Sequence, residues 1–289
     1  MNLGPYELND IYCGDSAVML KALPDASIDL TVTSPPYDSL RQYNGYAWDF
    51  TAIATQLYRV TKPGGVVVWV VGDATVNGSE TGSSFRQALG FMEIGFNLHD
   101  TMIYDKGNHP CHDPRNARYK QSFEYMFVLS KGKPATYNEI ADKLVRYPNK
   151  KHAATSHRKE DGEMRRYRTF ESKGDYQARG NIWAFNTGYM HSTKDLCAYD
   201  HDAIFPEALA RDHIISWSSP GDIILDPFSG SGTTAKMAKM LARNFIGFDI
   251  SQEYVDLAKR RIAAAPVPLP FMVESEPAVK VEQVKLFCD

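Results

Sequence analysis

The chain has 289 residues, of which 43% are hydrophobic, so it can fill the core of one large α/β domain with an insert or of two modest domains. It contains no stretch of about 18 apolar residues and no apolar leader after Met1, and its four cysteines are too few and too widely spaced for a zinc ribbon or a disulfide scaffold. We therefore expect a cytoplasmic protein without a membrane partner, and the net charge of −3 predicts no general attraction to polyanions.

Hydrophobic periodicity predicts alternating strands and helices in the first half of the chain. A strand at Ile28–Thr33 ends at Ser34-Pro35-Pro36, because proline stops both strand pairing and helix formation. Apolar residues at helical spacing predict a helix from Phe50 to Val60, which Lys62–Gly65 terminates. Two further buried strands are expected, at Val66–Val71 and Phe123–Leu129.

The pattern breaks down between residues 131 and 190, where polar and basic residues show little periodicity and predict an irregular insert. Order then returns, with a helix at Pro206–Trp217, a strand at Asp222–Asp226, a helix bearing Met237, Ala238 and Leu241, a strand at Asn244–Ile250 and a helix at Gln252–Ala263. We expect one α/β catalytic domain from residues 1–130 and 195–264, an insert at 131–194 and a flexible tail at 265–289.

A glycine-rich run, Asp226–Thr234, lies between a predicted strand and a predicted amphipathic helix. Its glycines permit positive φ angles and let a ligand approach the backbone, and the N-terminus of the following helix can hold an anionic group. Asp249, at the end of the next predicted strand, is suited to accept hydrogen bonds from ribose hydroxyls. The alternative is a tight turn without a ligand, but the strand, helix and acidic residue together favour a nucleoside-containing cofactor.

Ser34-Pro35-Pro36-Tyr37 follows a strand and offers a hydroxyl, proline-held carbonyls and an aromatic face. These groups suit an amino group on a flat ring, whose lone pair is delocalised and whose N–H groups need acceptors. Ser34 Oγ and the Pro35 carbonyl are the candidate acceptors, and Tyr37 is the candidate to stack on the ring. A simple turn is the alternative for this motif, because Pro-Pro commonly breaks regular structure.

The run from Asp226 to Thr234 strongly resembles the cofactor motif of amino-methylating DNA methyltransferases, and the resemblance spans nearly the whole ordered chain. It implies a Rossmann-like fold that binds S-adenosylmethionine. The resemblance implies that Asp249 binds the ribose and that Asp15, after Gly14, contacts the adenine. The residues implied around the methionine part are Asp226, Phe228, Ser229, Gly230, Gly232 and Thr233.

The order of the motifs matches the permuted class of this family called β. The Ser34–Tyr37 loop comes first and the cofactor loop last, so the insert lies where that class carries its target-recognition segment. In the family, Ser at the first position of the catalytic loop is most typical of N4-cytosine enzymes, whereas Asp or Asn there is typical of N6-adenine enzymes. The resemblance therefore implies methyl transfer to cytosine N4 in double-stranded DNA, with adenine N6 as the alternative.

Two other functions stay open. A DNA-binding module could keep the fold without catalysis, although intact Ser34, Tyr37, Gly230 and Gly232 argue against this. Methylation of RNA or of a protein amide is the second, since related loops with a preceding Asn serve such substrates, although those relatives usually place the cofactor loop first. The permuted order and the basic insert favour DNA.

The insert is basic: residues 131–180 contain 13 Lys and Arg against 7 Asp and Glu, about +6, which leaves about −9 for the rest of the chain. Basic and aromatic residues alternate in it, as suits contacts to phosphates and base edges, although a solvated surface is the alternative. The candidate DNA-binding residues are Arg118, Lys150, Lys151, Arg158, Arg165, Arg166 and Arg168.

Two short motifs remain. His109–Asp113 contains crowded metal-ligand types without a second pair at helical spacing, so we expect no metal. Gln283–Phe287 resembles the peptide by which bacterial replication proteins bind the sliding clamp, and an accessible tail would suit such a peptide. The alternative is a segment that packs on the body of the protein. The sequence leaves both a monomer and a homodimer open.

Overall fold

The computed structural model describes residues 1–36, 48–107, 118–145, 151–152, 156–158, 161–166, 170–171, 175–200 and 204–266. The chain forms two units: the first runs up to Asn138 and resumes at Asn181, and the second includes Glu139–Gly180. No helix in the described ranges has the length and apolar character needed to cross a membrane.

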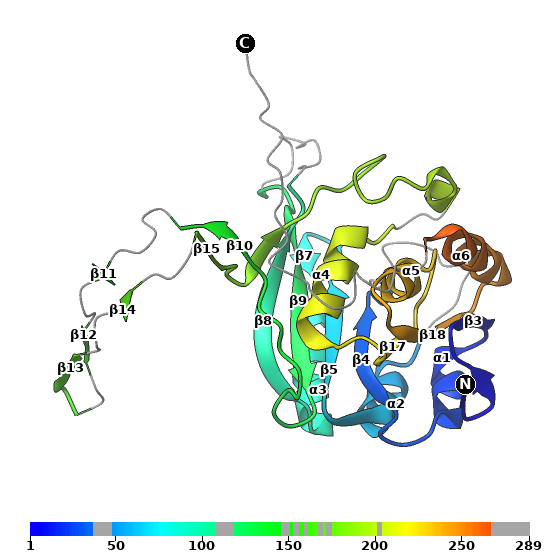
Figure 1. The fold of residues 1–289 in the computed structure, drawn as a ribbon, viewed down its shortest axis with the longest axis horizontal. Helices are drawn as coiled ribbons and strands as arrows, with labels where there is room; N and C mark the ends of the chain where they lie inside the picture. The colour runs from blue at the N-terminus through cyan, green and yellow to red at the C-terminus, as the bar shows by residue number, and fades with distance from the viewer. Residues whose placement is uncertain are drawn as a thin grey trace, which may run out of the picture. The chain divides into compact units, whose positions relative to one another are not determined.

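The first unit contains an eight-stranded sheet, formed by described residues in the order β16-β8-β9-β5-β4-β17-β18-β3 (Figure 1). The strands are β3 (Asp10–Cys13), β4 (Ile28–Thr33), β5 (Thr61–Val71), β8 (Asn97–Asp105), β9 (Phe123–Ser130), β16 (Ile182–Ala184), β17 (Ile223–Asp226) and β18 (Asn244–Asp249). All neighbours are parallel except that β9 is antiparallel to both β5 and β8. The carboxyl ends of the other seven strands therefore lie along one edge of the sheet.

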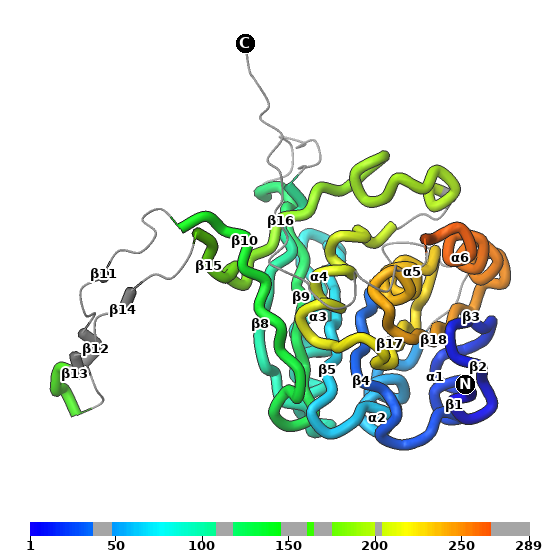
Figure 2. The backbone as a smooth tube through the Cα atoms, viewed as in Figure 1, coloured from blue at the N-terminus to red at the C-terminus, as the bar shows by residue number. Residues whose placement is uncertain are grey.

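Helices cover both faces of this sheet (Figure 2). They are α1 (Ser16–Met19), α2 (Phe50–Val60), α3 (Ser83–Ile94), α4 (Glu207–Trp217), α5 (Thr233–Met240) and α6 (Gln252–Ala264), with short 3-10 helices η1 (Leu20–Ala22) and η2 (Leu196–Asp200). Phe127 of β9 belongs to the core cluster that includes α2 and α3, whereas its neighbour Met126 contacts His213 of α4. Because successive strand residues point to opposite faces, α4 lies on the other face from α2 and α3.

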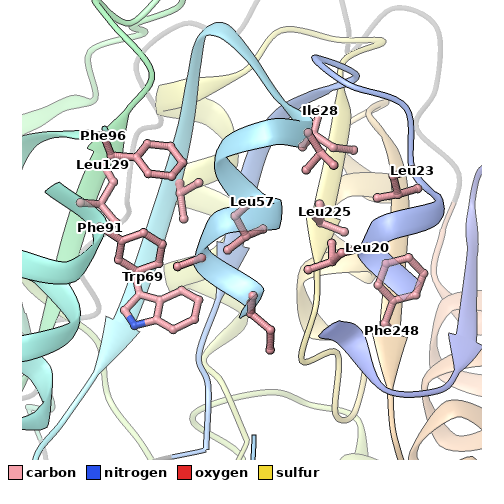
Figure 3. Close-up of a cluster of buried hydrophobic side chains, with 14 of the residues drawn as sticks. Leu20, Leu23, Ile28, Leu57, Trp69, Phe91, Phe96, Leu129, Leu225 and Phe248 are labelled. Atoms are coloured by element: carbon pink, nitrogen blue, oxygen red, sulfur yellow. The ribbon is translucent and has the colours of Figure 1, made fainter. Parts of the chain in front are cut away.

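Aromatic and aliphatic side chains fill the core between the sheet and α2 and α3 (Figure 3). Trp69 of β5 is fully buried, and its ring meets that of Phe91 at a centroid distance of 5.0 Å in an edge-on arrangement. The indole Nε1 of Trp69 donates to Gln87 Oε1 at 2.8 Å, so this buried donor is satisfied. The core thus packs against the middle of the sheet, beneath its carboxyl edge.

The boundaries differ from expectation at the start of β5. We expected the strand to begin at Val66, but β5 begins at Thr61 and includes Pro63-Gly64-Gly65. The ladder with β4 shifts register between Ile28 and Leu30 at this point, which accommodates the proline. Gly64 instead donates its N–H to the Lys131 carbonyl at 2.7 Å with a positive φ of 82°.

The second unit contains three short antiparallel ladders that are nested along the chain. Their strands are β10 (Ala141–Leu144) with β15 (Tyr176–Ala178), β11 (Lys151–His152) with β14 (Phe170–Glu171), and β12 (Ser156–Arg158) with β13 (Met164–Arg166). This nesting is the pairing pattern of one long hairpin. The expectation of irregular structure in this segment was therefore wrong. At its base, Arg179 Nε donates to Asp142 Oδ2 at 2.7 Å.

Small hairpins complete the described part of the fold. They are formed by β1 (Asn2–Leu3) with β2 (Tyr6–Glu7) and by β6 (Thr75–Val76) with β7 (Ser79–Glu80).

Candidate active site

The two loops predicted to carry the chemistry meet at the carboxyl edge of the sheet. β4 and β17 are parallel neighbours with Thr31 opposite Leu225, so the loops that follow them leave the sheet side by side. The hydroxyl of Thr33 donates to Asp226 Oδ1 at 2.7 Å, which joins the end of one strand to the start of the cofactor loop. Thr234 Oγ1 adds a bond to the Val32 carbonyl at 3.1 Å. Ser34 therefore begins a loop directly beside the cofactor loop.

The described part of the catalytic loop is packed into the protein. Ser34 and Pro36 are half-buried and Pro35 is buried, while Tyr37 lies outside the described residues. Two prolines restrict the backbone here, so the Ser34 hydroxyl and the Pro35 carbonyl have little freedom to move apart. Such rigidity is what two hydrogen-bond acceptors for one amino group require.

The cofactor loop, residues 226–234, takes a backbone path that favours glycine. Gly230 and Gly232 have φ angles of 48° and 76°, in the left-handed region. The Gly232 N–H donates to the Ser229 carbonyl at 2.7 Å, and α5 begins at Thr233 with no side chain capping it. A Cβ on Gly232 would come within 2.7 Å of the Ala258 Cβ, so α5 and α6 approach closely here. The uncapped helix N-terminus offers free N–H groups to an anion.

Asp249 ends β18 beside this loop. Its Oδ2 accepts the Gly230 N–H at 2.7 Å and its Oδ1 accepts the Ser251 N–H at 2.9 Å. Burial raises the pKa of Asp249, although these backbone hydrogen bonds act in the opposite direction. A carboxylate has about four acceptor positions, so Asp249 retains capacity for hydroxyl donors.

The adenine-contacting candidate, Asp15, lies at the end of the neighbouring strand. β3 pairs with β18, and the Gly14 N–H donates to the Asp249 carbonyl at 2.8 Å. Asp15 is exposed and caps α1 by accepting the Ala17 N–H at 2.8 Å. The next residue, Ser16, is buried and its hydroxyl donates to the Pro227 carbonyl. The structure thus brings Asp15 to the same edge as Asp249.

Phe228 and Ser229 occupy the middle of the cofactor loop. Phe228 is half-buried, and its ring lies edge-on to Trp48 at 5.3 Å and to Trp69 at 6.1 Å. Ser229 is buried: its hydroxyl donates to the Asp226 carbonyl at 3.1 Å and its N–H to the Phe248 carbonyl at 2.9 Å. The loop is therefore anchored to the sheet, and Phe228 keeps part of its surface accessible.

Asp226 is a buried carboxyl group whose pKa is raised to about 6. Burial is the main cause, and repulsion from Asp249 adds to it, while hydrogen bonds from Thr33, Thr234 and the Phe228 N–H act against it. At neutral pH the group is therefore mostly ionised, and it accepts the Thr33 hydroxyl and the Phe228 N–H at 3.1 Å.

This raised pKa predicts a pH-dependent contribution to stability. The ordinary pKa is 3.8, so between pH 4 and pH 6 the folded chain binds more protons at Asp226 than the unfolded chain does. Protonation of Asp226 therefore stabilises the folded state at low pH, and this stabilisation is lost as the pH rises through about 6. Asp226→Asn does not titrate. Its free energy of unfolding, measured by urea denaturation, is therefore expected to rise relative to the unsubstituted chain by up to about 3 kcal/mol between pH 4 and pH 7. A pH-independent difference would contradict the raised pKa.

The structure locates only part of the predicted DNA-binding set. Arg118 is partly exposed and donates to the Gly78 carbonyl, with its Nη1 3.7 Å from Glu80 Oε1. The candidates placed by their backbone on β11, β12 and β13 are Lys151, Arg158, Arg165 and Arg166. Lys150 and Arg168 lie outside the described residues. The His109–Asp113 motif, where no metal is expected, also lies outside them. Within the described ranges, no group of three His, Cys, Asp or Glu residues could hold a metal ion.

Sequence reasoning missed two contributors to this site. Thr33 was assigned only to a strand, although its hydroxyl joins the two loops. Arg261 was assigned only to the predicted helix at Gln252–Ala263, but it is buried and donates to the Ser231 carbonyl at 2.6 Å. The available signal for Arg261 was its position beside Ile262 on the apolar face of α6, where a charged residue requires buried partners.

Comparison with known proteins identifies the family. A family model described as DNA methylase, of the N6/N4 amino-methylating group, matches residues 28–260, so the chain belongs to the N6/N4 DNA methylase family. It is 57% identical over 245 residues to the orphan methyltransferase M.BamHII of Bacillus amyloliquefaciens, covering 84% of this chain and 92% of that protein.

Two solved structures are similar in fold. PvuII DNA methyltransferase, a cytosine-N4-specific protein, matches with a TM-score of 0.64 at 20% identity, covering 90% of each chain. TTHA0409 of Thermus thermophilus, a putative DNA modification methylase solved with S-adenosyl-L-methionine, matches with a TM-score of 0.60 at 25% identity, covering 89% of this chain and 94% of that chain. The chain is accordingly an S-adenosylmethionine-dependent DNA methyltransferase with the fold of that enzyme class.

The groups at the carboxyl edge fit this cofactor chemically. The N-terminus of α5 has no side-chain cap and suits the methionine carboxylate. The half-buried Asp249 has acceptor capacity for ribose hydroxyls, and the half-buried Phe228 offers apolar surface.

Proposed function

We propose that this enzyme methylates N4 of cytosine, rather than N6 of adenine, in double-stranded DNA. Ser34 at the first position of the catalytic loop supports cytosine, because Ser is the residue typical of N4-cytosine enzymes in the family. The assignment of the site rests on the hydrogen bond from Thr33 to Asp226, because this bond holds Ser34 beside the loop that is suited to the cofactor. We assign the catalytic loop to Ser34, Pro35, Pro36 and Tyr37.

The chemistry follows from the acceptors in this loop. When bound, S-adenosylmethionine supplies a methyl group on a positively charged sulfur. Ser34 Oγ and the Pro35 carbonyl accept hydrogen bonds from the two amino hydrogens of cytosine, which localises the nitrogen lone pair and aims it. Tyr37 stacks on the flipped base. Attack of the amine nitrogen on the methyl carbon would form the N–C bond as the S–C bond breaks, with S-adenosylhomocysteine as the leaving group, and the methylated nitrogen would then release one proton to water. No enzyme nucleophile is required.

The base is identified by digesting DNA, methylated with isotope-labelled cofactor, to nucleosides for mass spectrometry. We expect labelled N4-methylcytosine. Labelled N6-methyladenine would keep methyl transfer but overturn the choice of base. Label in RNA or protein substrates, with none in DNA, would overturn the choice of substrate.

We further propose that residues 131–194 form the target-recognition insert of a catalytic domain built from residues 1–130 and 195–264. Replacing Arg158, Arg165 and Arg166 with glutamine should weaken DNA binding and reduce the dependence of log Kd on log salt by about one for each lost phosphate contact. S-adenosylmethionine affinity should not change. Lys62→Gln removes a charge that pairs with Asp29 at the opposite edge of the sheet and serves as a control. An unchanged salt dependence in the triple variant would contradict the proposal.

We also propose that Gln283–Phe287, which lies outside the described residues, is a clamp-binding peptide. Phe287→Ala should abolish binding of the full chain to a purified bacterial sliding clamp while methylation of naked DNA is unchanged. Equal clamp binding by both chains would contradict this assignment.

A further inference from the structure

Four charged side chains form a hydrogen-bonded cluster next to the cofactor loop. Arg261 of α6 and Lys236 of α5 are the cations, and Asp195 and Glu207 are the carboxylates. The Arg261 side chain is 0% exposed and the Lys236 side chain 9% exposed. The two positive and two negative charges balance, as buried charges require.

Arg261 holds the cofactor loop directly. Its Nη1 donates to the Ser231 carbonyl at 2.6 Å, to Ser231 Oγ at 2.9 Å and to Thr233 Oγ1 at 3.2 Å. These residues flank Gly232, which has left-handed backbone and no side chain to fix its conformation. Arg261 therefore constrains the turn that leads into the N-terminus of α5.

The carboxylates hold the other side of the guanidinium. Arg261 Nε lies 3.0 Å from Asp195 Oδ2, and its Nη2 lies 2.9 Å from Glu207 Oε1. Lys236 Nζ bridges the same two carboxylates at 2.7 Å each. Burial alone would raise the pKa of Asp195, but hydrogen bonds from Lys236 and Arg261 lower it overall, so the carboxylate stays ionised. The planar fork of Arg261 is thus fixed from three directions.

The carboxylates belong to the chain that returns from the basic insert. Thr193 Oγ1 donates to Glu207 Oε1 at 2.6 Å, and the Glu207 N–H donates to the Ser192 carbonyl at 3.0 Å. Tyr199 adds a bond from its hydroxyl to the Thr193 carbonyl at 2.9 Å. This ordered segment supplies the fixed acceptors against which Arg261 is held.

We propose that Arg261 is a positioning residue for S-adenosylmethionine: held by Asp195 and Glu207, it fixes the Ser231–Thr233 backbone in the conformation that receives the cofactor. The inference rests on the proposed role of the cofactor loop. A rigid loop binds more tightly, because less conformational freedom is lost on binding. Arg261 touches neither DNA nor the reacting atoms in this scheme and acts through the loop.

The first test is Arg261→Met, which keeps an unbranched apolar side chain of similar reach but loses all donors. We expect S-adenosylmethionine affinity, measured by calorimetry, to fall about tenfold, since bonds from a charged donor to the loop are lost. Affinity for DNA should stay within twofold. The matched control is Lys239→Met, because Lys239 also joins α5 to α6, through the Ile262 carbonyl at 2.6 Å, but does not contact the loop. Normal cofactor affinity in Arg261→Met would overturn the proposal.

A double variant separates positioning from stability. Arg261→Met leaves two half-buried carboxylates facing one cation, so its denaturation midpoint should fall. Adding Glu207→Gln restores the charge balance and should recover much of the midpoint, but the affinity should stay about tenfold weak because the loop contacts are still missing. Affinity that recovers together with the midpoint would show a purely structural role and overturn the proposal.

Two more variants complete the test. If Arg261→Met does not fold, Asp195→Asn is the alternative variant. It leaves the bonds from Arg261 to Ser231 in place but removes one charge that orients the guanidinium, so S-adenosylmethionine affinity should fall about threefold. Unchanged affinity would contradict the proposal.

Asp249→Ala tests the cofactor loop itself. If it leaves cofactor affinity unchanged, the proposed site is wrong. If it weakens binding while Arg261→Met does not, only the role of Arg261 fails.

Discussion

Ser34→Ala is expected to lower the single-turnover rate of methyl transfer about hundredfold while S-adenosylmethionine affinity stays within twofold. The substitution removes one of the two acceptors that localise the lone pair of the base amine, and this interaction strengthens as the nitrogen acquires positive charge. The cofactor should be unaffected, because the Thr33–Asp226 bond that joins the loops is retained. Single-turnover methylation of DNA at saturating cofactor measures the effect.

Ser27→Ala is the matched control for this substitution. Ser27 precedes β4 at the opposite edge of the sheet, and its hydroxyl donates to the Pro24 carbonyl at 2.7 Å. It should keep the full rate of methyl transfer. A Ser34→Ala enzyme with a rate within twofold of the unsubstituted chain would remove Ser34 from the chemistry.

Gly232→Ala is expected to destabilise the protein by about 3 kcal/mol and to weaken S-adenosylmethionine binding at least tenfold. The φ of 76° is costly for any residue with a side chain, and the added Cβ would lie 2.7 Å from the Ala258 Cβ and 3.1 Å from its Cα. The second contact is with backbone, so α5 or α6 must shift, and the cofactor loop shifts with them. Urea denaturation and calorimetry measure the two effects.

Gly82→Ala separates backbone strain from this collision. Gly82 also precedes a helix in left-handed conformation, with a φ of 65°, but a Cβ there would meet only Arg86 Nη1 at 3.9 Å. It should cost about 1 kcal/mol and leave cofactor affinity unchanged. Equal effects of the two substitutions would show that the approach of α5 to α6 is unimportant for the loop.

Long apolar runs made most of the central sheet predictable. β5, β9, β17 and β18 are buried along most of their length, and each contains a continuous run of apolar or glycine residues that a polar residue or turn ends. The cofactor loop was predictable for the same reason, since Asp226 and Asp249 end two such strands. That the two loops meet could not be predicted without knowing the strand order. This order places β4 beside β17, although about 190 residues of chain separate them.

Elements with inverted or weak patterns were missed. α3 exposes Phe85, Leu89 and Met92 while its buried face mixes Ser84 and Gln87 with Phe91, so its apolar residues lie on both faces. Most of β8 is at least partly accessible, and its polar and apolar residues do not alternate, so the sequence gives no clear strand signal there. The ladders of the insert are two to four residues long, and backbone pairing of that kind leaves little trace in composition.

Long-range polar contacts explain why the cluster around Arg261 was not predicted. Its partners Asp195, Glu207 and Ser231 lie 66, 54 and 30 residues away in the chain. Each of these residues is ordinary in its local sequence, because charged and small polar residues are common in surface segments. Only tertiary packing makes Arg261 buried and gives it acceptors.

The most direct test of the central claim, that the two loops form one site for methyl transfer, is a crystal structure of the chain with S-adenosylhomocysteine. We predict that the ribose hydroxyls lie within hydrogen-bond distance of Asp249, about 2.7 Å, with the amino-acid part at the N-terminus of α5 and the sulfur directed toward Ser34. A cofactor product bound away from Asp249, or with its sulfur directed away from the Ser34 loop, would contradict this account of the site.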